Sequence, residues 1–277
     1  MPEGDTVWRT AQRLDHALSG RALTKSDFRV PQWAEVDLTG QLVLETVSRG
    51  KHLLTRLETV TLHTHLKMEG SWHVYGHHTS WRSPAFQARV VLTNESWQAV
   101  AFRLGEVELV ERTSEGDVVG HLGPDLLGPD WCLDEALSRL RAIPQRPLGE
   151  ALLDQRNLAG IGNMYKGEVC FLFGIHPRTP VADVAALPAL VERARTLLWV
   201  NKDRAQQATT GDLRRGKSLW VYARAGQPCR RCGSKIRSAT FDELPVRDAT
   251  AKGSLSPDQD RARSTYWCPT CQPEPKR

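Results

Sequence analysis

The sequence predicts an α+β protein with an antiparallel β-sandwich or barrel in its N-terminal part and helices in its C-terminal part. Between about residues 21 and 110, apolar and polar residues alternate in short runs that turn residues separate. After about residue 132, apolar residues recur at spacings of three and four instead. Such a change of period marks a change from strands to helices. The length of 277 residues agrees with two domains and a small additional module.

The first element is expected to be a helix over residues 5–18, where Val7, Ala11, Leu14 and Leu18 form one apolar stripe. The strands expected after it are, in chain order, LVLETV, HLLTRL, TVTLHTHL, SWHVY, FQARVVLT, WQAVAFRL and EVELV. Many short strands with turn residues between them are typical of an antiparallel sandwich or barrel.

The C-terminal half begins after a Gly/Pro/Asp-rich stretch at 120–131, which is expected to be a linker. The helices expected after it cover residues 133–143, 149–155, 164–174 and 187–200. Residues 242–262 are polar, contain Pro, Gly and Ser, and have almost no aliphatic side chains, so we expect a mobile loop there.

Composition excludes several protein classes. With 40% hydrophobic and 25% charged residues, the chain can bury a core, which argues against disorder, collagen and coiled coils. It contains no apolar run long enough for a membrane span. Its start lacks a basic region followed by an apolar one, so we expect no secretory signal and a cytoplasmic location. In that compartment, its six cysteines are expected to be thiols or metal ligands, not disulfides.

The charge is unevenly distributed along the chain. The net charge is +5, but residues 201–277 alone hold 16 basic and 8 acidic residues. A basic module beside a nearly neutral body favours a polyanionic partner, with nucleic acid as the first choice. The alternative is a solvated basic tail, which the paired cysteines in the same region make less favourable.

Two CxxC pairs, Cys229 with Cys232 and Cys268 with Cys271, predict a metal site. Each pair places two thiolates on one turn, and together they complete a tetrahedral sulfur site for one structural zinc ion. The competing interpretation is a redox dithiol, which needs only one CxxC at a helix start. The two remaining cysteines, Cys132 and Cys170, are expected to be packing residues.

The amino terminus offers a second chemical possibility. Pro2 follows Met1, and removal of Met1 would leave a secondary amine at the chain end. An α-amino group has a pKa of about 7.7–8.0, against about 10.4 for lysine, so part of it is unprotonated at neutral pH. Its attack on a sugar C1′ would give an iminium, an electron sink for elimination, and Glu3 beside it is a candidate acid/base. The alternative is that the amino terminus has no catalytic role.

Several segments in fixed order carry a resemblance to a known family: MPEGDT, SRGKHLL (48–54), HLKMEG (65–70), GPD (123–125), LLDQRNLAGIGNMYKGEVCFLFGIHP (152–177), VYARAGQPCRRCG (221–233) and RSTYWCPTCQ (263–272). Together they resemble the formamidopyrimidine-DNA glycosylase/endonuclease VIII family, and most closely a second bacterial type of endonuclease VIII. The resemblance implies an N-terminal antiparallel β-sandwich flanked by helices at 1–118, a linker at 119–131, a helix–two-turn–helix domain at 132–222 and a four-cysteine zinc finger at 223–277.

The resemblance also implies catalytic roles. Pro2 matches the Schiff-base nucleophile, and Glu3 matches the acid/base that assists base release and sugar-ring opening. Lys51 matches the lysine that binds phosphate and assists β-elimination. Arg263 matches the finger arginine that holds phosphates and supports δ-elimination.

Four further positions are implied to contact DNA. Asn163 matches an asparagine that grips a phosphate together with backbone amides, at a helix start that suits an anion. Met68 falls in the loop that fills the space left by a flipped nucleotide; the alternative for it is a core methionine. Lys67 and His121 occupy DNA-contact positions where the endonuclease VIII branch typically has glutamine and arginine.

The function implied is a bifunctional DNA glycosylase/AP lyase of base excision repair, a zinc-containing monomer that acts on damaged double-stranded DNA. The segments MPEG, LAGIGN and TYWCP favour the branch that removes oxidised pyrimidines, whereas HLKMEG leans toward the purine-directed branch. Thr6 replaces the usual glutamate at the sixth position, with Asp5 before it. A lyase with little base-removal activity, or a non-catalytic zinc-finger DNA-binding protein, therefore stays open as an alternative.

Overall fold

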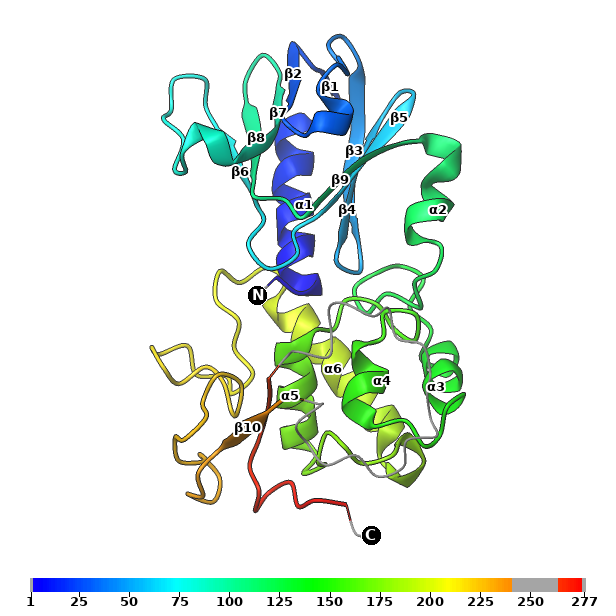
Figure 1. The fold of residues 1–277 in the computed structure, drawn as a ribbon, viewed down its shortest axis with the longest axis vertical. Coiled ribbons are helices and arrows are strands. Elements are labelled where there is room, and N and C mark those ends of the chain that lie inside the picture. The colour runs from blue at the N-terminus through cyan, green and yellow to red at the C-terminus, as the bar shows by residue number, and fades with distance from the viewer. Residues whose placement is uncertain (1, 241–263, 276–277) are drawn as a thin grey trace. The chain divides into compact units, whose positions relative to one another are not determined.

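The structure is a computed structural model that describes residues 2–240 and 264–275 (Figure 1). The chain divides into two compact units, Met1–His121 and Leu122–Arg277. Each unit has its own apolar core, and the boundary falls between the last strand of the large sheets and the first long helix of the second half.

The first unit begins with helix α1 (Gly4–Leu18), which confirms the helix expected over 5–18. Its buried residues include Val7, Ala11, Leu14 and Leu18, the four positions of the apolar stripe. Helix α1 contacts strands of both sheets of this unit. Its apolar face therefore closes a core to which both sheets contribute.

Two antiparallel sheets form the rest of the first unit (Figure 1). The five-stranded sheet has the order β1 (Arg21–Ala22), β3 (Leu42–Arg49), β4 (His52–Leu57), β5 (Val60–His65) and β9 (Glu106–Glu111). The four-stranded sheet has the order β2 (Lys25–Phe28), β7 (Ala88–Thr93), β8 (Gln98–Phe102) and β6 (Ser71–Tyr75). The seven strands predicted from alternation are confirmed as β3 to β9. The short strands β1 and β2 add one strand to each sheet.

The pairing of β4, β5 and β9 brings polar side chains of distant segments together. His52 lies opposite His65, and on the other side of β5, His63 lies opposite Glu108 and His65 opposite Glu106. Because side chains alternate between the faces of a sheet, these five residues share one face.

The second unit is helical. It contains α3 (Leu133–Arg141), α4 (Leu148–Leu153), α5 (Asn163–Leu172) and α6 (Leu187–Asn201), which correspond to the four predicted helices. It also contains the short helix η4 (Val181–Asp183), whereas the short helices of the first unit are η1 (Pro31–Trp33), η2 (Ala85–Gln87), η3 (Arg112–Ser114) and α2 (Glu115–Val119). In the described part of the chain, no helix is both long and apolar enough to pass through a membrane.

Helix α5 is the central element of the second unit. Every residue from Asn163 to Phe171 is buried. Met164, Tyr165 and Val169 belong to the core of the helical unit, whereas Phe171 packs with Cys229 and Cys268 of the paired-cysteine module. The helix is therefore covered on both sides.

The paired-cysteine module has a short antiparallel hairpin, β10 (Arg237–Ala239) with β11 (Thr265–Trp267). The expected loop 242–262 lies outside the described residues. Of the two remaining cysteines, Cys170 is buried as expected, but Cys132 is exposed. The packing role predicted for Cys132 was wrong, because this residue precedes α3 at the surface and its side chain does not enter the core.

Candidate active site and nucleic-acid interface

In the first unit, the candidate nucleophile Pro2 stands directly before helix α1. Glu3 occupies the N-cap position, with its backbone oxygen accepting the N–H groups of Thr6 at 2.9 Å and Val7 at 3.0 Å. The Glu3 residue is fully buried. The start of the chain is thereby fixed at the positive end of the α1 dipole.

The replacement of the usual sixth-position glutamate by Thr6 changes the first helical turn. Asp5 is buried, and its Oδ1 accepts the backbone N–H of Thr6 at 2.8 Å. The Asp5 carboxylate therefore stabilises the helix start. It lies three residues from Pro2 along the chain, so it remains a candidate for the role of the missing glutamate.

Lys51 lies in the tight connection between β3 and β4. Strand β3 ends at Arg49, strand β4 begins at His52, and these two residues are paired. Gly50 has φ +58°, a backbone conformation that glycine adopts without strain. The segment SRGK thus encodes a hairpin that presents Lys51 at its tip.

Lys67 and Met68 follow β5 in the loop before β6. Met68 is 59% exposed, so the core alternative for this residue was wrong. The Lys67 ammonium pairs with Glu106 at 2.7 Å. The Met68 side chain is accessible to a ligand, whereas the charge of Lys67 is partly compensated within the protein.

His121 is exposed and its ring centroid lies 6.2 Å from that of His52. His52 and His65 are also close, with centroids 4.9 Å apart. Burial, together with the neighbouring histidines, lowers the pKa of His52 to about 2. Burial and the Lys67 charge lower the pKa of His65 to about 3. Both rings are therefore neutral at physiological pH.

In the second unit, Asn163 begins helix α5 after the GIG turn. Gly160 has φ +103°, and Gly162 is the extended N-cap of the helix. The Asn163 side chain donates to the backbone oxygen of Ser264 at 3.0 Å, and its Oδ1 accepts a hydrogen bond from Lys166 Nζ at 2.6 Å. Asn163 thus joins the helix start to the segment that enters β11.

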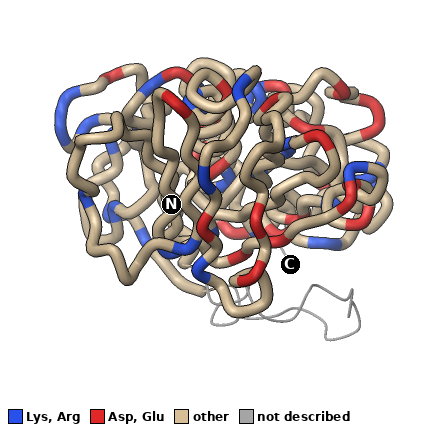
Figure 2. Tube along the Cα trace, turned by 90° about the horizontal axis from the view of Figure 1, so that it is seen from above, with Lys and Arg blue, Asp and Glu red and all other residues tan. Residues whose placement is uncertain are grey.

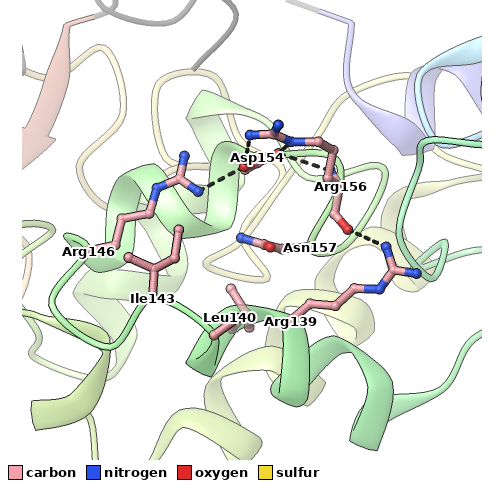
Figure 3. A pocket seen from close by; sticks show the side chains of 8 residues that line it. Arg139, Leu140, Ile143, Arg146, Asp154, Arg156 and Asn157 are labelled. Carbon is pink, nitrogen blue, oxygen red and sulfur yellow. Dashed lines mark hydrogen bonds and ion pairs between the residues drawn. The ribbon is translucent and has the colours of Figure 1, made fainter. Parts of the chain in front are cut away.

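The segment before this turn is fixed by a buried carboxylate (Figure 3). Asp154 pairs with Arg146 and with Arg156, each at 2.8 Å. Burial opposes ionisation of Asp154, but hydrogen bonds from Arg156 and Arg146 outweigh burial and lower its pKa to about 2. Gln155 then donates to the backbone oxygen of Ile161 and accepts from Gly160 N–H, both at 3.0 Å. These contacts give the GIGN turn its shape before any ligand is present.

Sequence reasoning missed two buried charged residues of α5. Lys166 is fully buried and donates to Thr265 Oγ1 at 2.7 Å as well as to Asn163. Glu168 is also fully buried and accepts the backbone N–H groups of Trp220, Val221 and Tyr222 at 2.8 to 2.9 Å, together with the Thr209 hydroxyl. The signal was available, because charged residues at both positions interrupt the otherwise apolar helix MYKGEVCFLF.

The four cysteines Cys229, Cys232, Cys268 and Cys271 converge, with all Sγ atoms within 4.8 Å of one another. The closest pairs are Cys232–Cys268 at 3.4 Å and Cys229–Cys271 at 3.9 Å. Backbone N–H groups of Arg231 and Cys271 point at the sulfurs of Cys229 and Cys268, each at 3.4 Å. A set of four thiolates with N–H donors around it fits a metal ion that the protein fully encloses.

The last catalytic candidate, Arg263, lies outside the described residues, which resume at Ser264. In the described part, basic and acidic residues are interspersed along the trace (Figure 2). Residues 213–240, all of them described, hold eight Lys and Arg side chains and no Asp or Glu, so the excess of basic residues after position 200 includes the paired-cysteine module.

Comparison with known proteins identifies the family. Residues 1–105 match the model of the formamidopyrimidine-DNA glycosylase N-terminal domain, and residues 122–198 match the model of the H2TH domain of the same glycosylases. The chain belongs to the formamidopyrimidine-DNA glycosylase/endonuclease VIII family. This is a family of DNA glycosylase/AP lyases of base excision repair, as the sequence resemblance implied.

The family relatives include proteins similar over their whole length. The "Probable endonuclease 8 2" of Streptomyces coelicolor is 52% identical over 99% of this chain and 95% of its own. The "DNA-(apurinic or apyrimidinic site) lyase Nei2" of Mycolicibacterium smegmatis is 46% identical over 98% of this chain and 99% of its own. A Lactococcus lactis formamidopyrimidine-DNA glycosylase, solved non-covalently bound to AP-site DNA, superposes with a TM-score of 0.75 at 20% identity, covering 99% of this chain and 100% of that one. That likeness confirms the fold.

Proposed function

We propose that this glycosylase-family chain removes oxidised pyrimidines from damaged double-stranded DNA and then nicks the strand by β,δ-elimination. The observation that carries the proposal is the start of the chain, where Pro2 precedes Glu3, the fully buried residue at the N-cap position of α1. An amine at this position is next in sequence to a carboxyl group and precedes the N-terminus of a helix.

The proposed reaction begins when the Pro2 nitrogen attacks C1′ of the damaged nucleotide and the bond from C1′ to the base breaks. The base leaves with a proton that Glu3 supplies or relays. Opening of the sugar ring gives an iminium between Pro2 and C1′. Loss of a C2′ proton to a base then expels the 3′-phosphate, and a second elimination expels the 5′-phosphate. Water hydrolyses the remaining iminium, releases the unsaturated sugar remnant as an aldehyde and restores the Pro2 amine.

The other candidates hold the DNA during these steps. Lys51 is presented at a hairpin tip, where its ammonium can bind a phosphate and assist β-elimination. Asn163, at the start of α5, grips a second phosphate together with backbone N–H groups of the turn. Arg263 supports δ-elimination. Met68, Lys67 and His121, all in the first unit, contact the duplex around the everted nucleotide.

The four cysteines are proposed to bind one structural Zn²⁺. The ion would fix the finger around Cys229, Cys232, Cys268 and Cys271 and would take no part in the chemistry, because protein sulfurs fill all four positions. The proposal also includes the expected monomeric state and cytoplasmic, nucleoid-associated location of the enzyme.

Borohydride trapping on a thymine-glycol duplex tests the proposal. Wild-type protein should form a covalent complex, and Pro2→Gly should trap less, because the primary glycine amine is a weaker nucleophile than the secondary proline amine and gives an imine that must be protonated before it can act as an electron sink. Pro84→Gly, a change at an exposed loop proline, is the matched control and should trap like wild type. Equal trapping by Pro2→Gly would show that the proline ring nitrogen is not required, and the residue that carries the trapped sugar then decides whether the chain-end amine is the nucleophile.

A second candidate function is an AP lyase with little base-removal activity. It is favoured by Thr6 in place of the usual glutamate and by the name of the Mycolicibacterium smegmatis relative, which specifies only a lyase. An abasic duplex and a thymine-glycol duplex separate the possibilities. Nicking of both indicates the bifunctional enzyme, nicking of the abasic duplex alone indicates the lyase, and nicking of neither indicates a non-catalytic DNA-binding protein.

A further inference from the structure

A second group of metal-ligand side chains lies in the first unit, away from the cysteines. His63 of β5 and Glu106 and Glu108 of β9 each offer one donor atom, and these atoms all lie within 4.8 Å of one another. The group has one imidazole nitrogen and two carboxylates, a donor set that suits a divalent transition ion such as Zn²⁺.

The strand register fixes this group. His63 lies directly opposite Glu108, and Glu106 lies two residues from Glu108 on the same face. His63 Nδ1 is 3.0 Å from the Glu108 carboxylate. The side chain of His63 is 1% exposed and that of Glu108 is 38% exposed, so a buried nitrogen is combined with a carboxylate that solvent ions can reach.

His52 fixes the orientation of the His63 imidazole. His52 Nδ1 is 2.8 Å from His63 Nε2, and the two rings are stacked with centroids 5.1 Å apart. His63 Nδ1 faces the carboxylates and donates its proton to Glu108. To bind a metal ion, Nδ1 would release this proton, and Nε2 would carry the remaining ring proton and donate it to His52 Nδ1. Metal-binding histidines commonly donate the N–H of their second ring nitrogen to a hydrogen-bond acceptor, which fixes the ring and its tautomer.

The protein currently balances these carboxylates with a cation of its own. Lys67 Nζ pairs with Glu106 at 2.7 Å, and the Lys67 side chain is 33% exposed. Burial opposes ionisation of Glu106, but the hydrogen bond from Lys67 outweighs it and lowers the pKa of this carboxyl group. A flexible, partly exposed lysine can turn into solvent and leave both carboxylates to another cation.

We propose that His63, Glu106 and Glu108 form a binding site for one Zn²⁺-type ion, which exchanges with the ammonium of Lys67. The site is separate from the four-cysteine cluster, and its existence does not rest on the proposed glycosylase chemistry, although it shares Lys67, a proposed DNA-contact residue.

Equilibrium dialysis of the purified full-length protein against Zn²⁺ near neutral pH, followed by total metal analysis, tests the site. Wild-type protein should hold one more equivalent of zinc than His63→Gln. Glu108→Gln should bind this equivalent at least about tenfold more weakly. His52→Gln should lower the zinc affinity by about 10- to 100-fold, because the contact that orients His63 is lost. Lys67→Met should bind it up to about fivefold more tightly, because the competing ion pair is gone.

Two matched controls exclude general surface binding. Glu111→Gln removes a carboxylate from the same strand on the opposite face, and His78→Gln removes an exposed histidine elsewhere in the unit. Both should hold as much zinc as wild type. Equal zinc content in wild type and His63→Gln would overturn the proposal, as would an equal loss in the controls. Any metal at the four cysteines cancels in each comparison, so failure of the zinc-finger assignment is separately visible.

Discussion

Asn163 donates its side-chain amide to the backbone oxygen of Ser264, 3.0 Å away and 101 residues later in the chain. The turn that is proposed to hold a phosphate is thereby joined to the strand of the paired-cysteine module. Lys166 strengthens the connection, because its buried ammonium lies between Asn163 Oδ1 and the Thr265 hydroxyl.

Thr265→Val should destabilise the protein by about 1–3 kcal/mol, because it removes an acceptor from a buried ammonium. Thr270→Val is the control, since the Thr270 hydroxyl is exposed and its loss should change the free energy of unfolding by less than about 0.5 kcal/mol. Urea denaturation of both variants measures the difference. Equal free energies of unfolding of the two variants would show that the hydrogen bond from Lys166 to Thr265 does not stabilise the fold.

Glu168→Gln should lower the free energy of unfolding by about 3 kcal/mol. The neutral amide cannot accept all the hydrogen bonds that the carboxylate accepts from the backbone N–H groups of residues 220–222. Glu135→Gln breaks only an exposed ion pair on α3 and should cost less than about 0.5 kcal/mol. Thermal or urea unfolding checks both values. A small effect of Glu168→Gln would mean that the segment 209–222 is held by its other contacts.

Asp154 predicts a pH dependence of stability. Its folded pKa is about 2, below the ordinary value of 3.8, so its contribution is present above about pH 4 and is lost as the pH falls toward 2. Asp154→Asn should therefore be about 2 kcal/mol less stable than wild type at neutral pH. The gap should narrow as the pH falls from 4 to 2. Denaturant titrations across that range would contradict the assignment if the gap stayed constant.

Met68→Ala should weaken binding to a lesion-containing duplex by about 1–2 kcal/mol, if the side chain fills the space of the everted nucleotide. Its stability should change by less than about 0.5 kcal/mol, because Met68 is 59% exposed. Fluorescence anisotropy with a duplex carrying an abasic analogue measures the affinity. Unchanged affinity would remove Met68 from the DNA contacts.

Cys268→Ser should lower the zinc content by one ion per chain and abolish duplex binding, because the remaining three thiolates no longer close the site. Cys132→Ser is the matched control, since Cys132 is exposed and distant from the cluster in sequence. Metal analysis and a binding titration on both proteins test the assignment. Full affinity in a metal-free Cys268→Ser protein would refute it.

Much of the fold was predictable because its signals are local. The period-two runs from Leu42 to Val110 and the apolar stripe of α1 each follow from burial of one face. Strands β1 and β2 were missed because one has two residues and the other, KSDF, is mostly polar. Their pairing depends on β3 and β7, which are distant in sequence.

The site residues were predictable from the sequence only where they belong to a short local motif. The cysteine spacing indicates the cluster, and the GIGN turn indicates a helix start. The His52–His63–Glu108 contacts were not predictable, because the register of three strands brings them together. The hydrogen bonds that Glu168 accepts from the backbone likewise join α5 to a segment about 50 residues later, and no local pattern in the sequence shows them.

The central claim is that the Pro2 nitrogen is the nucleophile, and the location of the trapped bond tests it most directly. Borohydride-reduced complex of wild-type protein with an abasic duplex would be digested to peptides and analysed by mass spectrometry. The account predicts that Met1 is absent and that the deoxyribose remnant is attached to the peptide beginning with Pro2. Attachment at Lys51 or another lysine, or a trapped chain that retains Met1, would contradict it.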